Sequence, residues 1–161
     1  MKRLPIVFLT LLMVACSTID CPVQNVVAIN YNIYNSDGTT LKLTDALTVS
    51  SQRKDGRDTL FNLGSNISAF SLPVSYSHPE DILLFTFSTA YGDSIYGIDT
   101  VWVKKDDIPH FESVDCSAAF FHRITGVRHT HNCIDSLVIS NTSVDYDQTT
   151  EHFRLYPKTR D

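Results

Sequence analysis

Short runs in which apolar and polar residues alternate constrain the fold of this chain more than any other feature. The segment from Val27 to Ile33 places apolar side chains at every second position, the pattern of a strand with one buried face. Turn signals such as Asn35–Gly38 and Asp55–Gly56 separate runs of this kind. No segment of the sequence shows the i, i+3, i+4, i+7 apolar spacing of an amphipathic helix. The pattern therefore predicts an all-β protein.

The number and spacing of these runs indicate one domain. About eight or nine strands are expected, because turn signals recur roughly every 8 to 15 residues. The nearly all-apolar run Ile82–Phe87 is expected to be a central strand. No repeat or linker marks a second domain, and 161 residues with 43% hydrophobic content suffice for one core. We predict a single antiparallel, immunoglobulin-like β-sandwich over residues 25–157 with a tail at 158–161; a partly open barrel is the alternative.

The N-terminus has the features of an export signal. Met1–Arg3 is cationic, and Leu4–Val14 forms an apolar run of 11 residues broken only by Pro5 and Thr10. A helix that spans a bilayer needs about 20 residues, so this run is too short to cross a membrane. Residues 1–15 are therefore expected to be a signal peptide.

The end of this segment, Met13–Cys16, resembles a bacterial lipobox, in which the cysteine receives a diacylglycerol before the signal peptidase cuts in front of it. The resemblance implies lipidation of Cys16 and a lipid-anchored tether at residues 16–24. Attachment would then use a thioether-linked diacylglycerol and a third, amide-linked chain such as palmitate, which meets the two-signal requirement for stable anchoring. The alternative is a plain secretory signal followed by an ordinary core cysteine.

Residues after the lipobox bear on location. Ser17 resembles the residue that permits sorting of lipoproteins to an outer membrane. Asp20 is the only acidic residue nearby, whereas surface-exported lipoproteins usually carry an acidic cluster, so the periplasmic face is favoured over the cell surface. Loss of Lys2 and Arg3 would leave 11 basic and 18 acidic residues, a net charge of −7. Anchoring is then expected to depend on acyl chains rather than anionic headgroups, and nucleic-acid binding is not expected.

The remaining cysteines fit an oxidising compartment. Acylation of Cys16 would leave Cys21, Cys116 and Cys133, and spacing alone cannot choose among their pairings. We favour Cys21 with Cys116, because a cysteine at the start of the mature fold is well placed to tether it; Cys116 with Cys133 is the rival pairing. No CxxC motif occurs, so a cysteine-based zinc or redox site is not expected.

Histidine spacing suggests a metal-binding alternative. His129 and His131 fall on one face of a predicted strand, and His122 could approach them. Such a set could hold Zn²⁺ and activate a water, which makes a metal-dependent periplasmic hydrolase the alternative function. The contrary interpretation puts His129 and His131 in a loop or on a solvated strand face. The acidic clusters 105–107 and 145–147 could take Ca²⁺, but neither matches an EF-hand loop.

Catalytic motifs are missing from the sequence. No nucleophile elbow, phosphate-binding glycine loop or HExxH occurs, so we assign no catalytic residue and expect no cofactor. A binding-module alternative rests on Tyr91, Tyr96 and Trp102, which could form a platform for a sugar ring or a peptide. An alternating Tyr/Trp face is also typical of ordinary sandwich packing.

Four Asp-Ser/Thr-apolar triplets resemble the O-glycosylation acceptor of exported Bacteroidetes-type proteins. Their hydroxyl residues are Thr59, Ser94, Thr100 and Ser136. Turn capping ahead of a strand explains the same triplets without a glycan.

Several segments together resemble a family of small Bacteroidetes lipoproteins classed as a domain of unknown function. The segments are Met13–Cys16, Asp20–Pro22, Cys116, Ile134–Ile139 and Glu151–Tyr156. The likeness covers essentially the whole mature chain and implies no activity, cofactor or catalytic residue; the family does not demand Cys133, which favours a disulfide without it. We expect a lipid-anchored cell-envelope lipoprotein of unknown biochemical role, acting as a non-enzymatic binding or scaffold module for a protein or glycan partner.

Overall fold

The computed structural model describes residues 26–53, 56–111, 116 and 118–159. This part of the chain contains ten strands and no helix. The strands are β1 (Ala28–Ile33), β2 (Ala46–Arg53), β3 (Gly56–Gly64), β4 (Ala69–Pro73), β5 (Glu80–Ser88), β6 (Ile95–His110), β7 (Ala119–His129), β8 (Ile134–Ile139), β9 (Ser143–Val144) and β10 (Phe153–Pro157).

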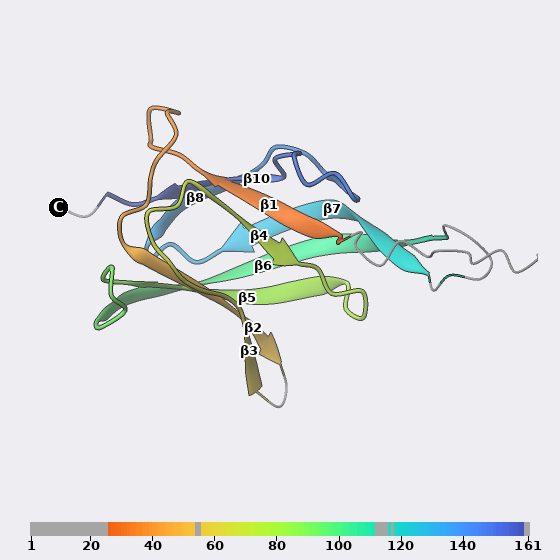
Figure 1. Cartoon of the computed structure of the whole chain (residues 1–161), viewed down its shortest axis with the longest axis horizontal. Helices are drawn as coiled ribbons and strands as arrows, with labels where there is room; N and C mark the ends of the chain where they lie inside the picture. Colours follow the sequence, from red (N-terminus) through yellow and green to blue (C-terminus); the bar gives the residue numbers. More distant parts are fainter. Residues whose placement is uncertain (1–25, 54–55, 112–115, 117, 160–161) are drawn as a thin grey trace, which may run out of the picture.

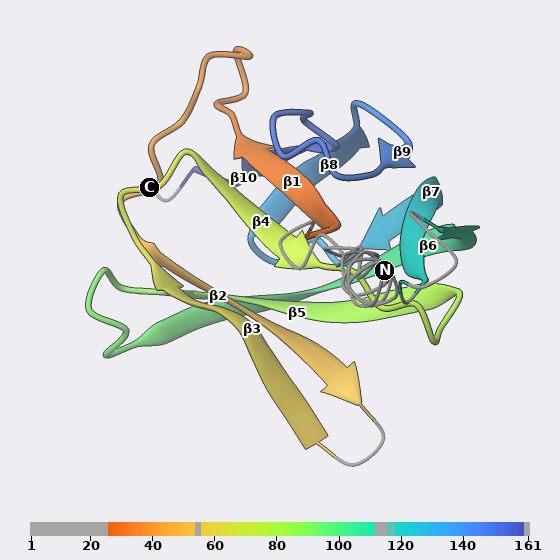
Figure 2. The same cartoon turned by 45° about the vertical axis from the view of Figure 1, so that its right-hand side comes forward.

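The strands form two packed layers (Figure 2). One sheet has the order β4-β1-β10-β8, and the other has the order β3-β2-β5-β6-β7-β9. Paired strands are antiparallel except β1 and β10, which run parallel. The β2–β3 hairpin projects away from the sandwich (Figures 1 and 2). Neither sheet closes on itself.

The predicted all-β sandwich is confirmed, and the barrel alternative is not formed. The run Ile82–Phe87 lies inside β5, which is flanked by β2 and β6 in the larger sheet. The described strands number ten rather than eight or nine. The additional one is β9, whose two residues are too few to show an alternation.

The core is centred on Tyr31 of β1. Its ring stacks on Phe70 of β4 at 4.9 Å and on Phe153 of β10 at 5.0 Å between centroids. Phe85 of β5 approaches the same ring edge-on at 5.9 Å. All four side chains are buried, and Phe85 comes from the opposite sheet. These aromatic contacts therefore join the two layers.

Strand β6 positions most of the polar groups discussed below. It is 16 residues long, and with β7 it extends beyond the rest of the sandwich at one end (Figure 1). Its inward positions alternate from Asp99 through Val101 and Val103 to Lys105, all of them buried. The strand therefore buries a carboxylate at one end of its inner face and an ammonium group farther along, and both need partners there.

The predicted signal peptide (1–15), the lipidation residue Cys16 and the tether (16–24) lie outside the described residues. A search of the described part for helices of sufficient length and hydrophobicity to cross a membrane finds none.

Candidate functional site

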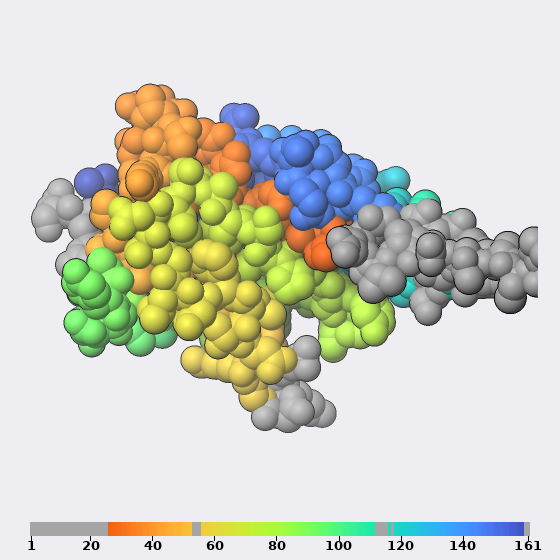
Figure 3. Space-filling view, viewed as in Figure 1, coloured from red at the N-terminus to blue at the C-terminus, as the bar shows by residue number. Residues whose placement is uncertain are grey.

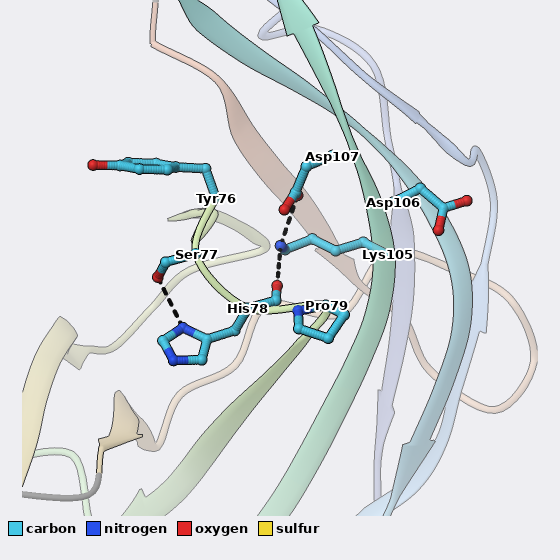
Figure 4. Close-up of a pocket in the computed structure, with 7 residues that line it drawn as sticks. All are labelled: Tyr76, Ser77, His78, Pro79, Lys105, Asp106 and Asp107. Atoms are coloured by element: carbon cyan, nitrogen blue, oxygen red, sulfur yellow. Dashed lines mark hydrogen bonds and ion pairs between the residues drawn. The ribbon is translucent and has the colours of Figure 1, made fainter.

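A shallow pocket lies where β6 passes the loop between β4 and β5. Its volume is about 330 Å³, and Figure 4 shows its lining: Tyr76, Ser77, His78, Pro79, Lys105, Asp106 and Asp107. Lys105 extends from β6 to this loop (Figure 4). Its backbone N–H donates to the Pro79 carbonyl at 2.9 Å, and its Nζ donates to the His78 carbonyl at 2.8 Å. Lys105 thus holds the loop through two hydrogen bonds.

Lys105 and Asp107 of the pocket lining form, together with His122, what we call the buried charge cluster. Asp107 Oδ1 lies 2.9 Å from Lys105 Nζ and 2.7 Å from His122 Nδ1. Because a carboxylate only accepts, His122 Nδ1 carries the proton. Burial opposes ionisation of Asp107, but hydrogen bonds from Lys105 and His122 outweigh it, and the pKa of Asp107 is lowered. Burial lowers the pKa of His122, which favours the neutral imidazole.

Asp81 lies near Lys105, and the Tyr31 hydroxyl lies near Asp81. Burial raises the pKa of Asp81, while the positive charge of Lys105 opposes that rise. The Tyr31 hydroxyl is buried and has no hydrogen-bond partner among the described residues. Burial, followed by the nearby charge of Asp81, raises the pKa of Tyr31. The Lys105 ammonium group is therefore close to two carboxyl groups, those of Asp107 and Asp81. Its positive charge is balanced by acidic groups of the protein itself.

The serines and the histidine at the pocket do not have the arrangement of a Ser-His-acid triad. In a Ser-His-acid triad, one imidazole nitrogen bonds the nucleophile and the other bonds the carboxylate. Here Ser77 and Ser75 both reach Nδ1 of His78, at 2.9 and 3.4 Å. The described residues thus show no imidazole linking a serine to a carboxylate. The buried charge cluster instead positions the loop that carries Tyr76.

Five aromatic rings surround the end of β6 and β7, and we call them the aromatic pole. Tyr76 stacks on Phe120 with centroids 5.1 Å apart. On the other side, His110 stacks on Phe121 at 4.2 Å, and Tyr146 meets Phe121 edge-on at 4.8 Å. The rings come from β6, β7 and the loops after β4 and β9. The aromatic pole is therefore a tertiary feature, which no local sequence pattern displays.

The predicted metal ligands are only partly brought together. His129 and His131 have ring centroids 4.3 Å apart. Each Nδ1 faces a backbone carbonyl, that of Thr130 at 2.7 Å for His129 and that of Asp135 at 3.1 Å for His131. His122 lies seven residues earlier on β7, roughly 23 Å away at the rise of a strand. No three His, Cys, Asp or Glu side chains in the described part converge as metal ligands.

The acidic clusters considered for Ca²⁺ have protein partners. Asp107 belongs to the buried charge cluster. Asp147 accepts hydrogen bonds from the Thr149 hydroxyl, the Thr150 hydroxyl and the Thr149 backbone N–H. These bonds lower the pKa of Asp147 to about 2. The Asp147 carboxylate oxygens thus accept hydrogen bonds within the turn after β9.

A second buried carboxylate, Asp99, organises the loop that carries the histidine pair. Its Oδ1 accepts from the Thr130 hydroxyl at 2.5 Å and the Asn132 N–H at 2.7 Å. Its Oδ2 accepts from the N–H groups of Cys133 and Ile134 at 2.6 and 2.7 Å. Burial opposes ionisation, but these four bonds outweigh it and lower the pKa of Asp99. This carboxylate substitutes for water around three backbone amides.

The aromatic platform is dispersed. The guanidinium of Arg128 lies 4.0 Å over the Trp102 ring and also donates to Glu80 at 3.1 Å. Tyr96 donates its hydroxyl to Asp45 at 2.9 Å, and Tyr91 lies exposed in the β5–β6 turn. One face of Trp102 is therefore covered by a cation rather than open to a sugar ring.

The remaining predicted residues are placed as follows. Cys116 is disulfide-bonded, whereas Cys133 keeps its thiol, half-buried against Gly97. Cys21 lies outside the described residues, so its pairing with Cys116 stays a prediction. Of the glycosylation candidates, Thr59 and Ser94 are exposed, and Thr100 and Ser136 are half-buried.

Comparison with known families shows to which family the chain belongs. The pattern of a family of unknown function, DUF6452, matches residues 46–157. The chain belongs to this family. The matched DUF6452 region begins at the first residue of β2 and ends at the last residue of β10, so it contains the pocket, the buried charge cluster and the aromatic pole. A search of curated proteins found no match, and a search of solved structures found none.

Sequence reasoning missed the buried charge cluster and Asp99. Both have a sequence signal in β6. Asp99, Lys105 and Asp107 lie at two-residue intervals from the buried Val101 and Val103, so they belong to the same face of the strand. Period-two reading therefore assigns these charges to the inner face. The aromatic pole had no such signal, because its members come from four separate segments.

Proposed function

We propose that the mature protein is a lipid-anchored lipoprotein of the cell envelope of a Bacteroidetes-type bacterium, with its sandwich serving as a non-enzymatic binding or scaffold module. The observation that carries the proposal is the lipobox Met13–Cys16 directly ahead of the fold. The first described strand begins at Ala28, twelve residues after Cys16. That spacing supports a short tether between an acylated terminus and a folded body.

The non-enzymatic part of the proposal is supported by how the described polar groups are used. Lys105, Asp107 and His122 bond to one another, and Asp99 bonds to backbone amides. Catalysis needs polar groups that are held ready for a substrate rather than satisfied by the fold. Neither the His129/His131 pair nor the Tyr96/Trp102 pair has a geometry that favours the hydrolase or glycan alternative over this proposal.

We propose the location from the residues after the lipobox. Ser17 and the lack of an acidic cluster support the outer membrane and its periplasmic face. A protease added to intact cells should leave the protein uncut, and permeabilising the outer membrane should expose it. Cleavage in intact cells would instead assign it to the cell surface.

Anchoring is tested on the full chain expressed in a lipoprotein-processing host. Intact mass and peptide mass spectrometry should find Cys16 as an acylated N-terminus, and the protein should enter the detergent phase on temperature-induced separation. Cys16→Ala should remain in the aqueous phase, whereas the matched control Cys133→Ala should partition like the wild type. An unmodified Cys16 in a protein that stays in the aqueous phase would overturn the proposal.

A further inference from the structure

We propose that the aromatic pole is a membrane-docking surface, which the protein lays against the interface of the bilayer that holds its acyl chains. The inference rests on the proposed lipid anchor and adds which end of the sandwich faces the lipid. It is carried by three observations: the exposure of apolar side chains at this end, the place where the chain enters the fold, and the short reach of the tether.

The end of the β6–β7 hairpin exposes apolar side chains beside the aromatic pole. Phe111 and Tyr76 are each 67% exposed, and Ile108 is 39% exposed. Ile108 and Phe111 lie at the end of β6, in the hairpin that extends beyond the sandwich (Figure 1), and Tyr76 lies in the loop between β4 and β5. Amphipathic and aromatic rings of this kind concentrate where headgroups meet acyl chains, because one part of the ring is apolar and another tolerates water.

The described chain enters the sandwich at this same end. The backbone carbonyl of Val26 accepts a hydrogen bond from the Gln148 side chain, two residues after Tyr146 of the aromatic pole. Ala28 is paired with Pro73, the last residue of β4, from which the chain continues to Tyr76. Figure 3 shows the start of the described chain, in red, beside the blue surface of the C-terminal part. The tether therefore leaves the fold next to the aromatic pole.

The reach of the tether then limits which end can face the membrane. Val26 is ten positions after Cys16, so even a fully extended chain between them spans at most roughly 36 Å. The disulfide-bonded Cys116 lies in the segment that joins β6 to β7, and pairing with Cys21 would shorten the free tether to five residues, at most roughly 18 Å. Tyr91 lies beyond the opposite end of β6, a strand roughly 53 Å long. The anchor thus holds the aromatic pole near the bilayer and leaves the Tyr91 end far from it.

The charge of the chain determines what kind of contact this is. The mature chain carries a net charge of −7, so anionic headgroups repel it. Docking must therefore come from shallow insertion of Phe111, Tyr76 and Ile108, to a depth of roughly 5 to 10 Å at the acyl boundary. Replacing neutral lipid by phosphatidylglycerol should weaken the contact or leave it unchanged.

The test uses the full lipidated protein in vesicles of phosphatidylcholine and phosphatidylethanolamine. Trp102 is the only tryptophan in the chain, so a Trp102→Phe parent allows one indole to be placed at will. Phe111→Trp puts it at the proposed docking surface. Tyr91→Trp puts it at an exposed position on the opposite end, as a matched control. Lipids brominated on their acyl chains near the headgroup quench only an indole that reaches the bilayer.

Docking predicts that the indole at position 111 shifts to shorter wavelength and is quenched by brominated lipid, while the indole at position 91 shows neither change. Quenching by aqueous acrylamide at position 111, with no effect of brominated lipid, would overturn the inference and leave the aromatic pole as a surface for another molecule. Vesicle flotation distinguishes failure of the lipid anchor from failure of the docking surface. A protein that does not float lacks the anchor, which defeats the proposed function; a protein that floats without quenching at position 111 defeats only the docking surface.

Discussion

The imidazole of His152 is joined to the backbone of Asn30, which lies 122 residues away in the sequence, by a hydrogen bond of 3.0 Å in which the Asn30 N–H donates to Nδ1. The other ring nitrogen, Nε2, lies 3.0 Å from the Ser143 carbonyl. A carbonyl only accepts, so Nε2 carries the only ring proton and His152 is neutral. This buried ring, in the loop between β9 and β10, links Asn30 of β1 to Ser143 of β9, and its bonding pattern fails when Nδ1 is protonated.

Acidification should therefore destabilise the fold through His152. Burial lowers the pKa of His152 below its ordinary value of 6.5 in the folded state. Below about pH 6.5 the unfolded chain takes up a proton that the folded chain refuses, so this contribution to stability is complete above that pH and is lost as the pH falls through the folded pKa. His152→Gln should lose about 1 to 3 kcal/mol near neutral pH and show a shallower further loss on acidification.

Urea denaturation at about pH 7.5 and about pH 5.5 measures both effects. The shallower slope is a reduction and not an abolition, because burial also lowers the pKa of His122. The exposed His78 provides the control for the substitution itself, and His78→Gln should change the unfolding free energy at about pH 7.5 by less than about 0.5 kcal/mol. An unchanged pH slope in His152→Gln would contradict the assignment of this histidine.

Lys105 and its neighbour Lys104 offer a matched pair for the buried charge cluster. The Lys105 side chain is fully buried against Asp107, whereas Lys104 is exposed on the other face of β6. Lys105→Met should cost about 3 kcal/mol, because it leaves a partly buried carboxylate without its cation and removes the bond to the His78 carbonyl. Lys104→Met should change the unfolding free energy by less than about 0.5 kcal/mol. Equal stability of the two variants would show that the cluster is dispensable.

The layer architecture could be read from the sequence, while its connectivity could not. Alternation over Val27–Ile33 and the apolar run Ile82–Phe87 correspond to β1 and β5. The expected single buried face of β1 was wrong, because Ala28 and Asn30 on its other face are buried as well. The parallel pairing of β1 with β10 joins residues more than a hundred positions apart. Such a pairing depends on how whole strands pack and not on the composition of either strand.

The separation of His122 from His129 could have been predicted from the sequence pattern alone. His122 and His129 both lie on β7, and residues seven apart on one straight strand point to opposite faces and lie far from each other. The predicted strand alone was therefore enough to separate them. The proximity of His129 to His131 followed from the same strand geometry, because residues two apart share a face.

Asp99 should stabilise the fold through its charge. Its carboxylate accepts from the N–H groups of Asn132, Cys133 and Ile134, and an amide at this position offers one oxygen and turns its NH₂ group toward donors. Asp99→Asn should therefore cost about 2 to 3 kcal/mol of unfolding free energy near neutral pH. The exposed Asp93 supplies the control, since Asp93→Asn should be nearly neutral.

The same variant should change behaviour in acid. The pKa of Asp99 is lowered in the folded state, so its contribution is complete above the unfolded pKa of about 3.9 and is lost as the pH falls through the folded pKa. Asp99→Asn and the wild type should thus converge in stability at the lowest pH at which both still fold. A constant gap between them would mean that shape rather than charge holds the loop.

The sulfur atom of Cys133 leaves no room for a side chain at Gly97. A Cβ added at Gly97 would overlap Cys133 Sγ, whereas Cys133 Cβ would lie 3.7 Å away. Gly97→Ala should therefore cost about 1 to 3 kcal/mol through overpacking, and combining it with Cys133→Ala should recover most of that cost. Thermal unfolding of the two single variants and the double variant measures the coupling. Gly126→Ala is the control, because its nearest neighbour lies 4.0 Å away; additive effects of Gly97→Ala and Cys133→Ala would refute the contact.

The His129/His131 pair should not retain zinc. Both rings use Nδ1 toward backbone carbonyls, which leaves only their two Nε2 atoms as ligands, and a zinc site needs at least three protein ligands. Protein purified without a metal-affinity step should contain far less than one zinc per chain, and a chelator should leave its melting temperature unchanged. His129→Ala/His131→Ala should behave as the parent does in the chelator experiment. One tightly bound zinc per chain that is lost in the double variant would contradict this prediction. It would mean that the protein supplies at least one further zinc ligand, and it would favour the metal-dependent hydrolase.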